Sequence, residues 1–504
     1  MEREVWLLCA TLAVPLLYYL TTLRRRHGNG RLPPGPRPLP IIGNALELRH
    51  GNLHHTLARL ARAHGPVMRL QLGPTTMAVV VSSRDAAAEA FTKHDRRLAA
   101  RFIPDAVHAL GWADRSIIYL PSSDPLWKTM RSILATHVVS PRSLAAARGV
   151  RERKVRDLVD HLRASAGQEV DVGKALYGAM INLVSSVFFS SDIVDLNAAE
   201  SAHGTIRDHV EGLSELMTKA NISDLFPFLR ALDLQGRRRT MAAHLGKIFD
   251  IVDGVIDARL AEATASSDQH DDLLQVLVNL ISTGQIDRRV VQALLFELFI
   301  TGTDTATITV EWALAELLRN PSTMAKVRAE IDGALGGKAT IEEPDASSLP
   351  YLNAVVKEVM RLHTVGPLLI PRQAVEDGVE IGGYTVPRGS TVIINVWAIM
   401  RDPTVWERPD EFMPERWFLG KAAEMEFKGK DFEFLPFGSG RRTCPGMPMA
   451  ERVVPHLLAS LLHAFEWRLP EGMSAEQLDV SERFTTGNIM AVPLKAVPVV
   501  ITTE

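Results

Sequence analysis

The sequence predicts a mainly α-helical protein with a minor β part. Apolar residues recur at helical spacing through four long stretches, at 145–165, 170–190, 205–220 and 240–262. The same periodicity continues from Asp287 to Arg319, which predicts a helix of roughly 50 Å, long enough to cross a whole domain. Two short runs rich in Val, Leu and Met, 67–72 and 76–82, lie on either side of Gly73-Pro74 and predict a pair of strands.

Composition indicates one large domain rather than several. The 504 residues contain no internal repeat, low-complexity tract or Ser/Gly-rich linker after about residue 50. Hydrophobic residues make up 46% and charged residues 23%, which is ordinary for a globular protein with a sizeable core. A formal net charge of −3 gives no indication of nucleic-acid binding. Cys9 and Cys444 are the two cysteines, so a disulfide framework is excluded and a reducing compartment is expected.

The N-terminus predicts a membrane anchor. Val5 to Leu23 is an apolar run without a charge, long enough to cross a bilayer as a helix, and Arg24 to Arg26 follow it directly. This positive excess on the C-terminal side predicts that the rest of the chain is cytosolic. A cleaved secretory signal is the alternative, but the apolar run is long and the basic cluster is typical of a stop-transfer sequence.

The next segment, Leu32 to Pro40, predicts a stiff spacer. Its many prolines exclude a helix or a central strand. A proline-rich partner-binding segment is the alternative, and the position directly after the anchor favours the spacer. We therefore expect an anchor at 1–27, a hinge at 28–45 and a folded domain at 46–504.

The loop FGSGRRTCPG at 437–446 is the strongest functional signal in the sequence. Its glycines lack a Cβ and allow the backbone to approach a flat cofactor closely. Pro445 suits the first turn of a following helix, expected at 449–466, which would place the Cys444 sulfur at a helix N-terminus and lower its pKa. The alternatives are an inert buried cysteine and a cysteine hydrolase, although no histidine lies near the loop at a recognisable spacing.

The motif F-x-x-G-x-R-x-C-x-G resembles the haem-binding loop of the cytochrome P-450 monooxygenases. All of its fixed positions match, from Phe437 through Arg442 and Cys444 to Gly446. The resemblance implies that Cys444 is the axial thiolate ligand of haem b, that Phe437 packs beside the sulfur and that Arg442 pairs with a haem propionate. It also implies the fold of that family, a triangular helical domain with small β-sheets, preceded by one N-terminal transmembrane helix.

Other residues are expected to hold the haem propionates. Trp127-x-x-x-Arg131 places an indole and a guanidinium one turn apart on one helical face, where both could reach a propionate. The same motif occurs at Trp397-x-x-x-Arg401, so a chance match is the alternative to a propionate-binding role. The resemblance favours Trp127 and Arg131, which lie where the family's early haem-contacting helix is expected. Arg372, in a proline-rich extended segment, is a further candidate to pair with a propionate.

The segment Thr301-Gly-Thr-Asp-Thr305-Ala306 lies in the middle of the long predicted helix. Its β-branched residues and glycine are poor helix formers and predict a weak point there. Asp304 and Thr305 supply an acid and a hydroxyl that could relay protons during oxygen activation, and a bend whose hydroxyls bond back to the helix is the alternative. The family pattern is A/G-G-x-D/E-T-T/S, so this chain departs at Thr301 and Ala306. The departures concern the shape and polarity of the pocket above the iron.

A charge triad completes the resemblance. Glu358-x-x-Arg361 lies on a helix predicted at 351–363, and Pro414-Glu-Arg416-Trp417 follows downstream. Glu358, Arg361 and Arg416 resemble the family's buried triad, which locks the core around the haem loop. Buried charges are tolerated only when they are fully paired, so the loss of one partner should be severe.

The resemblance also implies an activity. The run Asn395 to Asp402, together with PERW, is similar to plant microsomal members of the A type, and more loosely to the branch that hydroxylates terpenoids, including grass diterpene hydroxylases. The implied reaction inserts one oxygen atom from dioxygen into a C–H bond of a lipophilic molecule, with a terpenoid expected and a diterpene favoured. A monoterpenoid, alkaloid or phenolic substrate stays open. Pocket-lining residues are expected at Ile117, Leu298, Thr301, Val365, Leu369 and Thr486.

Electrons are expected from a separate protein, because the sequence contains no G-x-G-x-x-G and no other sign of a flavin or nicotinamide module. The resemblance implies an NADPH-cytochrome reductase in the endoplasmic reticulum membrane, with the catalytic domain on the cytosolic side. Four cations are candidates for docking that partner, or for an ordinary solvated face: Lys128, Lys428, Lys430 and Arg441.

Two other functions stay open at this point. The first is a haem-thiolate isomerase or dehydratase, against which the acid and alcohol at 304 and 305 argue. The second is a haem-binding sensor or membrane scaffold without turnover. Dependence of product formation on NADPH and oxygen would separate the first from a monooxygenase. Finding no product with any lipophilic substrate, despite reducible haem, would favour the second.

Overall fold

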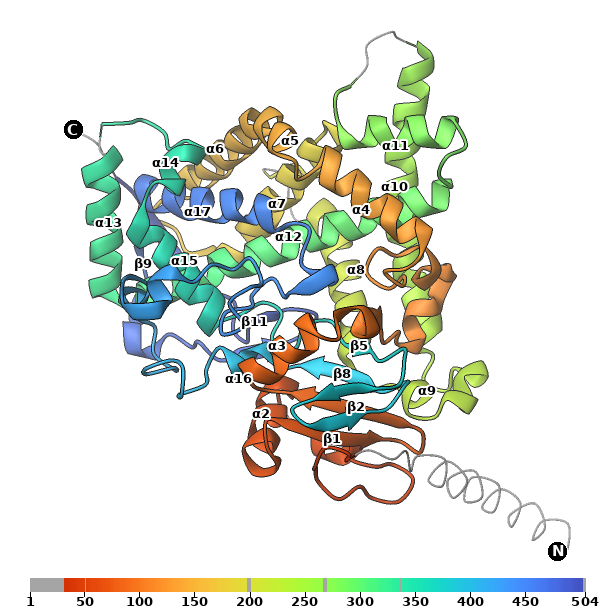
Figure 1. The fold of residues 1–504 in the computed structure, drawn as a ribbon. Coiled ribbons are helices and arrows are strands. Elements are labelled where there is room, and N and C mark those ends of the chain that lie inside the picture. The colour runs from red at the N-terminus through yellow and green to blue at the C-terminus, as the bar shows by residue number, and fades with distance from the viewer. Residues whose placement is uncertain (1–30, 50, 197–200, 266–269, 336, 502–504) are drawn as a thin grey trace, which may run out of the picture.

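The computed structural model describes residues 31–501 except 50, 197–200, 266–269 and 336. Helices fill most of the molecule, and the largest sheet lies at its lower edge in Figure 1. The prediction of a mainly helical protein with a minor β part is therefore confirmed. The predicted anchor at 5–23 lies outside the described residues.

The helices and strands follow the predicted periodicity closely. The helices are α2 (Leu53–His64), α3 (Arg84–Thr92), α4 (Pro125–His137), α5 (Pro141–Ala146), α6 (Arg148–Ala164), α7 (Val172–Phe189), α8 (Ser201–Thr218), α9 (Ile222–Leu225), α10 (Arg237–Ala265), α11 (Leu273–Ser282), α12 (Arg288–Arg319), α13 (Pro321–Leu335), α14 (Glu343–Ser347), α15 (Pro350–Leu362), α16 (Val396–Ile399) and α17 (Met447–Ala464). The strands are β1 (Val67–Leu72), β2 (Thr76–Val81), β3 (Ala100–Arg101), β4 (Val170–Asp171), β5 (Arg372–Gln373), β6 (Val379–Ile381), β7 (Tyr384–Val386), β8 (Thr391–Ile394), β9 (Phe465–Arg468), β10 (Glu482–Phe484), β11 (Asn488–Met490) and β12 (Lys495–Val500).

The largest sheet has the strand order β1-β2-β8-β5-β3. The predicted pair β1 and β2 is antiparallel, whereas β2 and β8 run parallel although they are far apart in sequence. A second sheet has the order β4-β12-β9, and two hairpins are formed by β6-β7 and β10-β11. The short strands β3 and β5 bring two arginines into the sheet, Arg101 opposite Arg372.

Helix α12 crosses the centre of the molecule and packs against α7, α10, α15 and α17 (Figure 1). It begins after Asp287, whose side chain accepts a hydrogen bond from the Arg289 amide at 2.7 Å and so satisfies one of the free N–H groups of the first turn. Both α7 and α12 are long and apolar enough to span a membrane, but most of each helix is buried inside the domain, as in core helices. The predicted weak point at 301–306 is wrong, because α12 is continuous there.

Three acids of α12 face neighbouring elements, Glu297 and Glu311 buried and Asp304 partly buried. Glu297 contacts the segment before α4, Asp304 lies near α8, and Glu311 accepts a hydrogen bond from the Leu494 amide at 3.0 Å. Burial raises the pKa of all three carboxyls, to about 7 for Glu297 and Asp304. The residues are seven apart and share one side of the helix.

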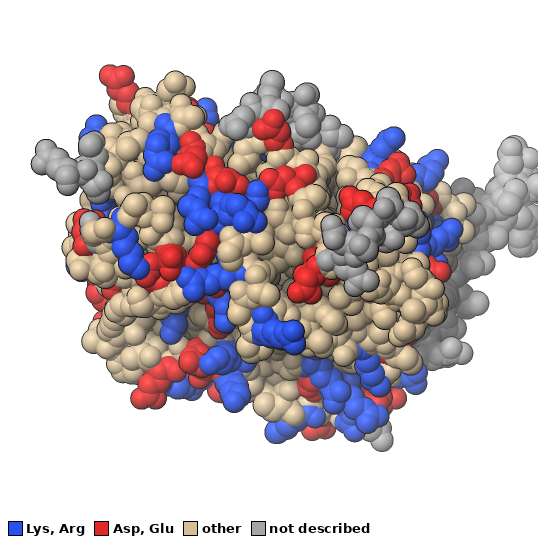
Figure 2. All heavy atoms as spheres, turned by 90° about the horizontal axis from the view of Figure 1, so that it is seen from above, with Lys and Arg blue, Asp and Glu red and all other residues tan. Residues whose placement is uncertain are grey.

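The surface carries charges of both signs. Seen from above, acidic and basic side chains are interspersed over the face drawn in Figure 2. This mixed distribution agrees with the small net charge of −3.

Candidate active site

The cysteine loop at 437–446 leads directly into α17. Gly446 is the N-cap of that helix, and Pro448, not Pro445, occupies the first turn. The prediction that Pro445 begins the helix is therefore wrong by a few residues. The Cys444 amide donates to the Phe437 carbonyl at 3.0 Å and closes the loop. Gly438 and Gly440 have φ of 68° and 72°, a region that favours glycine.

The Cys444 thiol combines an exposed side chain with surrounding protein on most sides of the sulfur. Burial raises the pKa of the thiol, although the amides of Gly446 and Met447 and the charge of Arg131 act in the opposite direction. The prediction of a lowered pKa is therefore wrong for the protein alone: the helix terminus contributes as expected, but desolvation is larger. A bound metal ion would supply the missing positive charge, since a coordinating thiol is deprotonated outright.

Three predicted arginines gather beside this loop. Arg442 lies 4.9 Å and Arg131 5.6 Å from the Trp127 ring centroid, and Arg131 donates to the Thr443 carbonyl at 3.3 Å. Trp127 donates its indole N–H to the Ile117 carbonyl at 3.0 Å. Arg372 donates to the Ser439 carbonyl at 3.0 Å, so the structure brings every predicted propionate partner to one place.

Arg101 is a fourth member that the sequence analysis missed. It lies on the two-residue strand β3 opposite Arg372, and its guanidinium donates to the Ile370 carbonyl at 2.6 Å. Burial, together with repulsion from Arg372 and Arg442, lowers the pKa of Arg101 well below its ordinary value. No motif marks this residue, because a two-residue strand has no periodicity.

The cluster of Arg101, Arg131, Arg372 and Arg442 is short of negative charge. Asp95 is the carboxylate that contacts it, 3.2 Å from Arg372. The Nε atoms of Arg101 and Arg372 are buried without a hydrogen-bond partner, and burial and neighbouring arginines lower the pKa of Arg442 to about 10. Buried charges require partners. The cluster therefore suits a ligand with two carboxylates, and a haem with its two propionates fits these residues.

The middle of α12 presents two threonines to the interior. Thr301 and Thr305 are exposed, whereas Ala306 and the rest of the helix beyond it are almost entirely buried. Their hydroxyls donate to the carbonyls one turn back, Thr301 to Glu297 at 2.6 Å and Thr305 to Thr301 at 2.8 Å. The back-bonding hydroxyls of the alternative are therefore present, but the bend is not. Exposed side chains in the middle of a core helix indicate an internal pocket beside them.

Asp304 is directed away from Thr305. Its carboxyl is buried near Arg207, Glu211 and Tyr177, and burial raises its pKa to about 7, with Arg207 opposing and Glu211 reinforcing the shift. Among the described residues, no hydrogen bond joins Asp304 to Thr305. Glu211 is 64% exposed, so this group of residues reaches from α12 to the surface. The arrangement suits an acid that exchanges protons with solvent.

Glu297 positions the segment that carries Ile117. Its carboxylate accepts hydrogen bonds from the Trp112 indole at 2.8 Å, the Ile117 amide at 2.9 Å and the Ser116 hydroxyl. The Ile117 carbonyl in turn receives the N–H groups of Trp127 and Arg442. This chain of contacts joins α12 to the arginine cluster, a link that sequence patterns did not indicate.

The predicted charge triad is assembled and buried. Glu358 lies 2.9 Å from Arg361 Nη2 and 2.9 Å from Arg416 Nε, and these side chains are 0%, 0% and 5% exposed. Trp417 and the Met413 amide each donate to the same carboxylate at 3.0 Å. Arg361 Nε also donates to it, at 3.0 Å, so the carboxylate accepts five hydrogen bonds.

The predicted pocket residues lie around α12 and the cysteine loop. Leu298, Thr301 and Thr305 share one face of the helix by spacing. Val365 meets the tip of the β10-β11 hairpin, where a Cβ on Gly487 would lie 3.3 Å from it. Leu369 lies beside Gly438 of the cysteine loop, and Thr486 donates to or accepts from the Ser214 hydroxyl of α8 at 2.9 Å.

The structure distinguishes the second Trp-x-x-x-Arg motif from the first and shows the surroundings of the candidate docking cations. Arg401 stacks on Trp397 at 4.2 Å and contacts Glu482, not the cysteine loop, so this second Trp-x-x-x-Arg is a different site. Of the four candidate docking cations, Arg441 lies 3.4 Å from Asp95 and Lys428 lies 2.8 Å from Glu426. Two of the four therefore already have a carboxylate partner.

Known proteins resemble this chain over nearly its whole length. It is 61% identical to cytochrome P450 76M5 of Oryza sativa subsp. japonica, with 99% of each chain covered. It is 56% identical to oryzalexin E synthase, over 99% of this chain and 98% of that protein, and 56% identical to ent-cassadiene C11-alpha-hydroxylase 1, over 99% of each, both from the same organism. The family model described as Cytochrome P450 matches residues 33–490. With its cysteine loop, arginine cluster and buried charge triad in place, this chain belongs to the cytochrome P450 family.

Proposed function

We propose that this chain hydroxylates a diterpene, with Cys444 as the thiolate ligand of its haem. Membership of the cytochrome P450 family makes the protein a haem-containing monooxygenase that acts on a lipophilic substrate and depends on a redox partner. The observation that carries the assignment is the internal thiol of Cys444 beside four arginines with too few carboxylates. Cys444 is the one cysteine among the described residues.

Each residue of the cluster has a distinct role in holding the haem. Arg101, Arg131, Arg372 and Arg442 would pair with the propionates, and the Trp127 ring would fix two of these guanidiniums by cation–π contact. Phe437 would shield the sulfur from water, and Gly446 leaves room beside it, since a Cβ there would lie 3.8 Å from Cys444 Sγ. The bound haem would supply the dioxygen chemistry, in which two electrons from the reductase and two protons allow one oxygen atom to enter the substrate and the other to leave as water.

Asp304 would supply protons for this chemistry. With a pKa of about 7, its carboxyl takes up and releases a proton near neutral pH, and Arg207 and Glu211 connect it to the surface. Thr305 presents a hydroxyl to the pocket and can hold a water molecule beside the substrate. Because Asp304 and Thr305 occupy different faces of α12, a rotation of the Asp304 side chain or a water chain must join them.

The substrate class follows from the pocket and from the named relatives. Ile117, Leu298, Val365 and Leu369 offer apolar surface, and Thr301 adds one hydroxyl where the family pattern has Ala or Gly. Two relatives are named as an oryzalexin synthase and an ent-cassadiene hydroxylase, which supports a diterpene hydrocarbon as substrate. A pocket of this kind orients the molecule by shape, with Thr301 as a polar contact.

The cellular setting is part of the proposal. The apolar run at 5–23 would anchor the chain in the endoplasmic reticulum membrane, and the spacer at 28–45 would hold the catalytic domain on the cytosolic face. An NADPH-cytochrome reductase in the same membrane would deliver electrons. Lys128 and Lys430 are exposed cations suited to contact such a partner.

Product formation in reconstituted membranes tests the function. The full chain and a plant reductase are combined in microsomes and supplied with NADPH, ent-cassadiene or geraniol, and products are identified by mass spectrometry. A hydroxylated diterpene that requires both NADPH and oxygen is the expected result. Conversion of geraniol alone would replace the diterpene by a monoterpenoid, and a product formed without NADPH and oxygen would favour an isomerase or dehydratase.

A further inference from the structure

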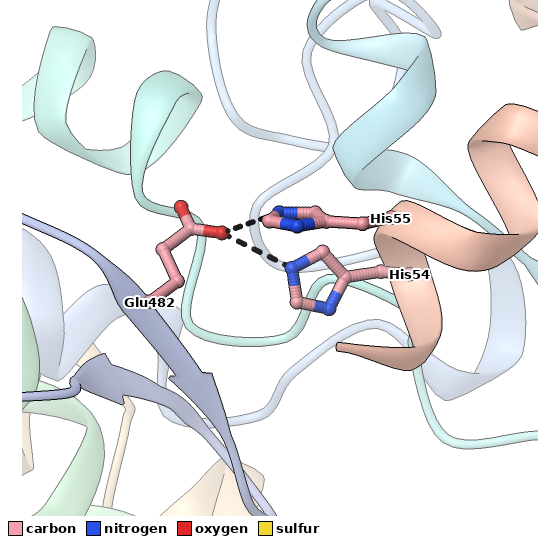
Figure 3. A group of neighbouring side chains, drawn as sticks. All are labelled: His54, His55 and Glu482. Atoms are coloured by element: carbon pink, nitrogen blue, oxygen red, sulfur yellow. Dashed lines mark hydrogen bonds and ion pairs between the residues drawn. The ribbon is translucent and has the colours of Figure 1, made fainter. Parts of the chain in front are cut away.

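Two histidines and a glutamate form a cluster that the oxygenation chemistry does not use. His54 and His55 are neighbours on α2, and Glu482 opens strand β10 near the other end of the chain. Both imidazole Nε2 atoms are directed at the same carboxylate oxygen, Oε2 of Glu482, at 3.1 Å for His54 and 3.0 Å for His55 (Figure 3). All three candidate ligand atoms lie within 4.8 Å of one another.

The other carboxylate oxygen of Glu482 is held from behind. Arg401 Nη2 lies 3.5 Å and His363 Nδ1 lies 3.4 Å from Oε1. His363 is fixed in turn, with its Nε2 at 2.7 Å from Glu316 and its ring stacked on Trp312 at a centroid distance of 3.8 Å. Such outer contacts orient the ligands of metal sites. Here they leave Oε2 facing the Nε2 atoms of His54 and His55.

We propose that His54, His55 and Glu482 form a binding site for one zinc ion. Two imidazole nitrogens and one carboxylate oxygen are ligands that zinc accepts, and two ligands of a tetrahedral zinc at about 2.0–2.1 Å lie about 3.3 Å apart. The separations of 3.0 and 3.1 Å match this spacing, so small side-chain movements admit the ion. Water would complete the coordination.

Zinc would replace the two hydrogen bonds that join the imidazoles to Glu482, because a metal-bound imidazole nitrogen carries no proton. His54 Nδ1 is buried without a partner, so this ring has one unsatisfied nitrogen with or without zinc.

Access and charge also permit the ion. His54 is fully buried, but the His55 side chain is 44% exposed and gives a route from solvent. Arg401 opposes a nearby cation, and the carboxylate of Glu316 behind His363 offsets that charge. Glu482 interacts with Arg401 through Oε1, on the side away from the proposed ion.

Zinc at this site would fix one wall of the substrate pocket. Asn52, just before α2, already accepts from the Phe484 amide at 2.9 Å and donates to the Glu482 carbonyl at 2.7 Å. The tip of the same hairpin contacts α8 through Thr486 and Ser214. A metal bond between α2 and β10 would therefore restrict the hairpin at its base.

Equilibrium dialysis tests the site directly. The haem-loaded full chain without a polyhistidine tag is dialysed against micromolar zinc sulfate, and bound zinc is counted by elemental analysis. One zinc per chain is expected for the native protein and for His64→Ala, a change of the last residue of α2 that leaves the cluster intact. His55→Ala should weaken zinc binding more than tenfold. This change removes a side chain that is 44% exposed, and an unchanged haem absorbance spectrum is the check that the variant is folded. Glu482→Gln should also weaken zinc binding.

Hydrogen exchange provides an independent readout. Zinc should slow amide exchange at 482–490 in the native protein and leave it unchanged in His55→Ala. Absence of bound zinc in the native protein, or equal zinc binding by His55→Ala, would overturn the proposal. Zinc bound with no change in exchange at the hairpin would overturn the restriction of the pocket wall.

Discussion

Replacing Glu358 by glutamine should destabilise the protein severely although the side chain keeps its shape. The Glu358 carboxylate accepts from Arg361 Nη2, Arg416 Nε and the Met413 amide on one oxygen, and from Arg361 Nε and the Trp417 indole on the other. Glutamine would turn one of these oxygens into an NH₂ group that faces N–H donors. It would also leave two guanidiniums, 0% and 5% exposed, without their counter-charge.

The expected cost of Glu358→Gln is about 3–5 kcal/mol, the range for breaking a buried ion pair by removing one partner. Two or three hydrogen bonds turned into donor–donor contacts, at about 1–3 kcal/mol each, give a similar figure. The assay is urea denaturation of the haem-loaded protein, followed by haem absorbance and circular dichroism. Glu466→Gln is the matched control, because Glu466 pairs with Arg468 on the surface and its loss should change little. Coinciding midpoints for the two variants would refute the reasoning.

Three further substitutions test the active site. Asp304→Asn should lower turnover by about tenfold or more with little change in substrate binding, because the proton donor is lost. Burial raises the pKa of Asp304 to about 7, so the folded protein favours the protonated carboxyl and the stability of the native protein falls as pH rises from about 3.9 toward 7. Relative to the native protein, Asp304→Asn should therefore gain more stability at pH 8 than at pH 5. Equal gains at the two pH values would contradict this. Arg101→Leu should release haem on dilution several times faster than the exposed control Arg96→Leu, measured by haem transfer to apomyoglobin, and equal rates would remove Arg101 from the haem site. Gly487→Ala places a Cβ 2.9 Å from Ile308 Cδ1 and should shift the hydroxylation position, read by mass spectrometry; an unchanged product would place the hairpin tip away from the substrate.

The sequence analysis was most successful where a pattern is local. Helical periodicity located α12 almost to the residue, since Asp287 caps it and Pro321 follows its end. The cysteine loop and the charge triad were found because their sequence motifs are specific and occur in the expected order along the chain. Propensity misled at 301–306, where packing on both sides holds α12 straight despite its poor helix formers.

Features that depend on distant parts of the chain were not predictable. Arg101 joins the arginine cluster only because β3 pairs with β5, a contact that spans much of the chain. The raised pKa of the Cys444 thiol depends on desolvation, which a sequence does not reveal. His54 and Glu482 are 428 residues apart, and neither has a neighbouring pattern that indicates the other. In each case the feature arises from the tertiary structure and not from a local sequence motif.

The carbon-monoxide difference spectrum of the reduced protein tests the central assignment most directly. Cys444→Ser is compared with Cys9→Ser, the change of the other cysteine of the chain, which lies outside the described residues. The native protein and Cys9→Ser should both show a Soret band at about 450 nm, as expected for a thiolate-bound haem, and Cys444→Ser should lose it. A band that survives in Cys444→Ser, or that is absent from the native protein despite bound haem, would contradict the role assigned to Cys444.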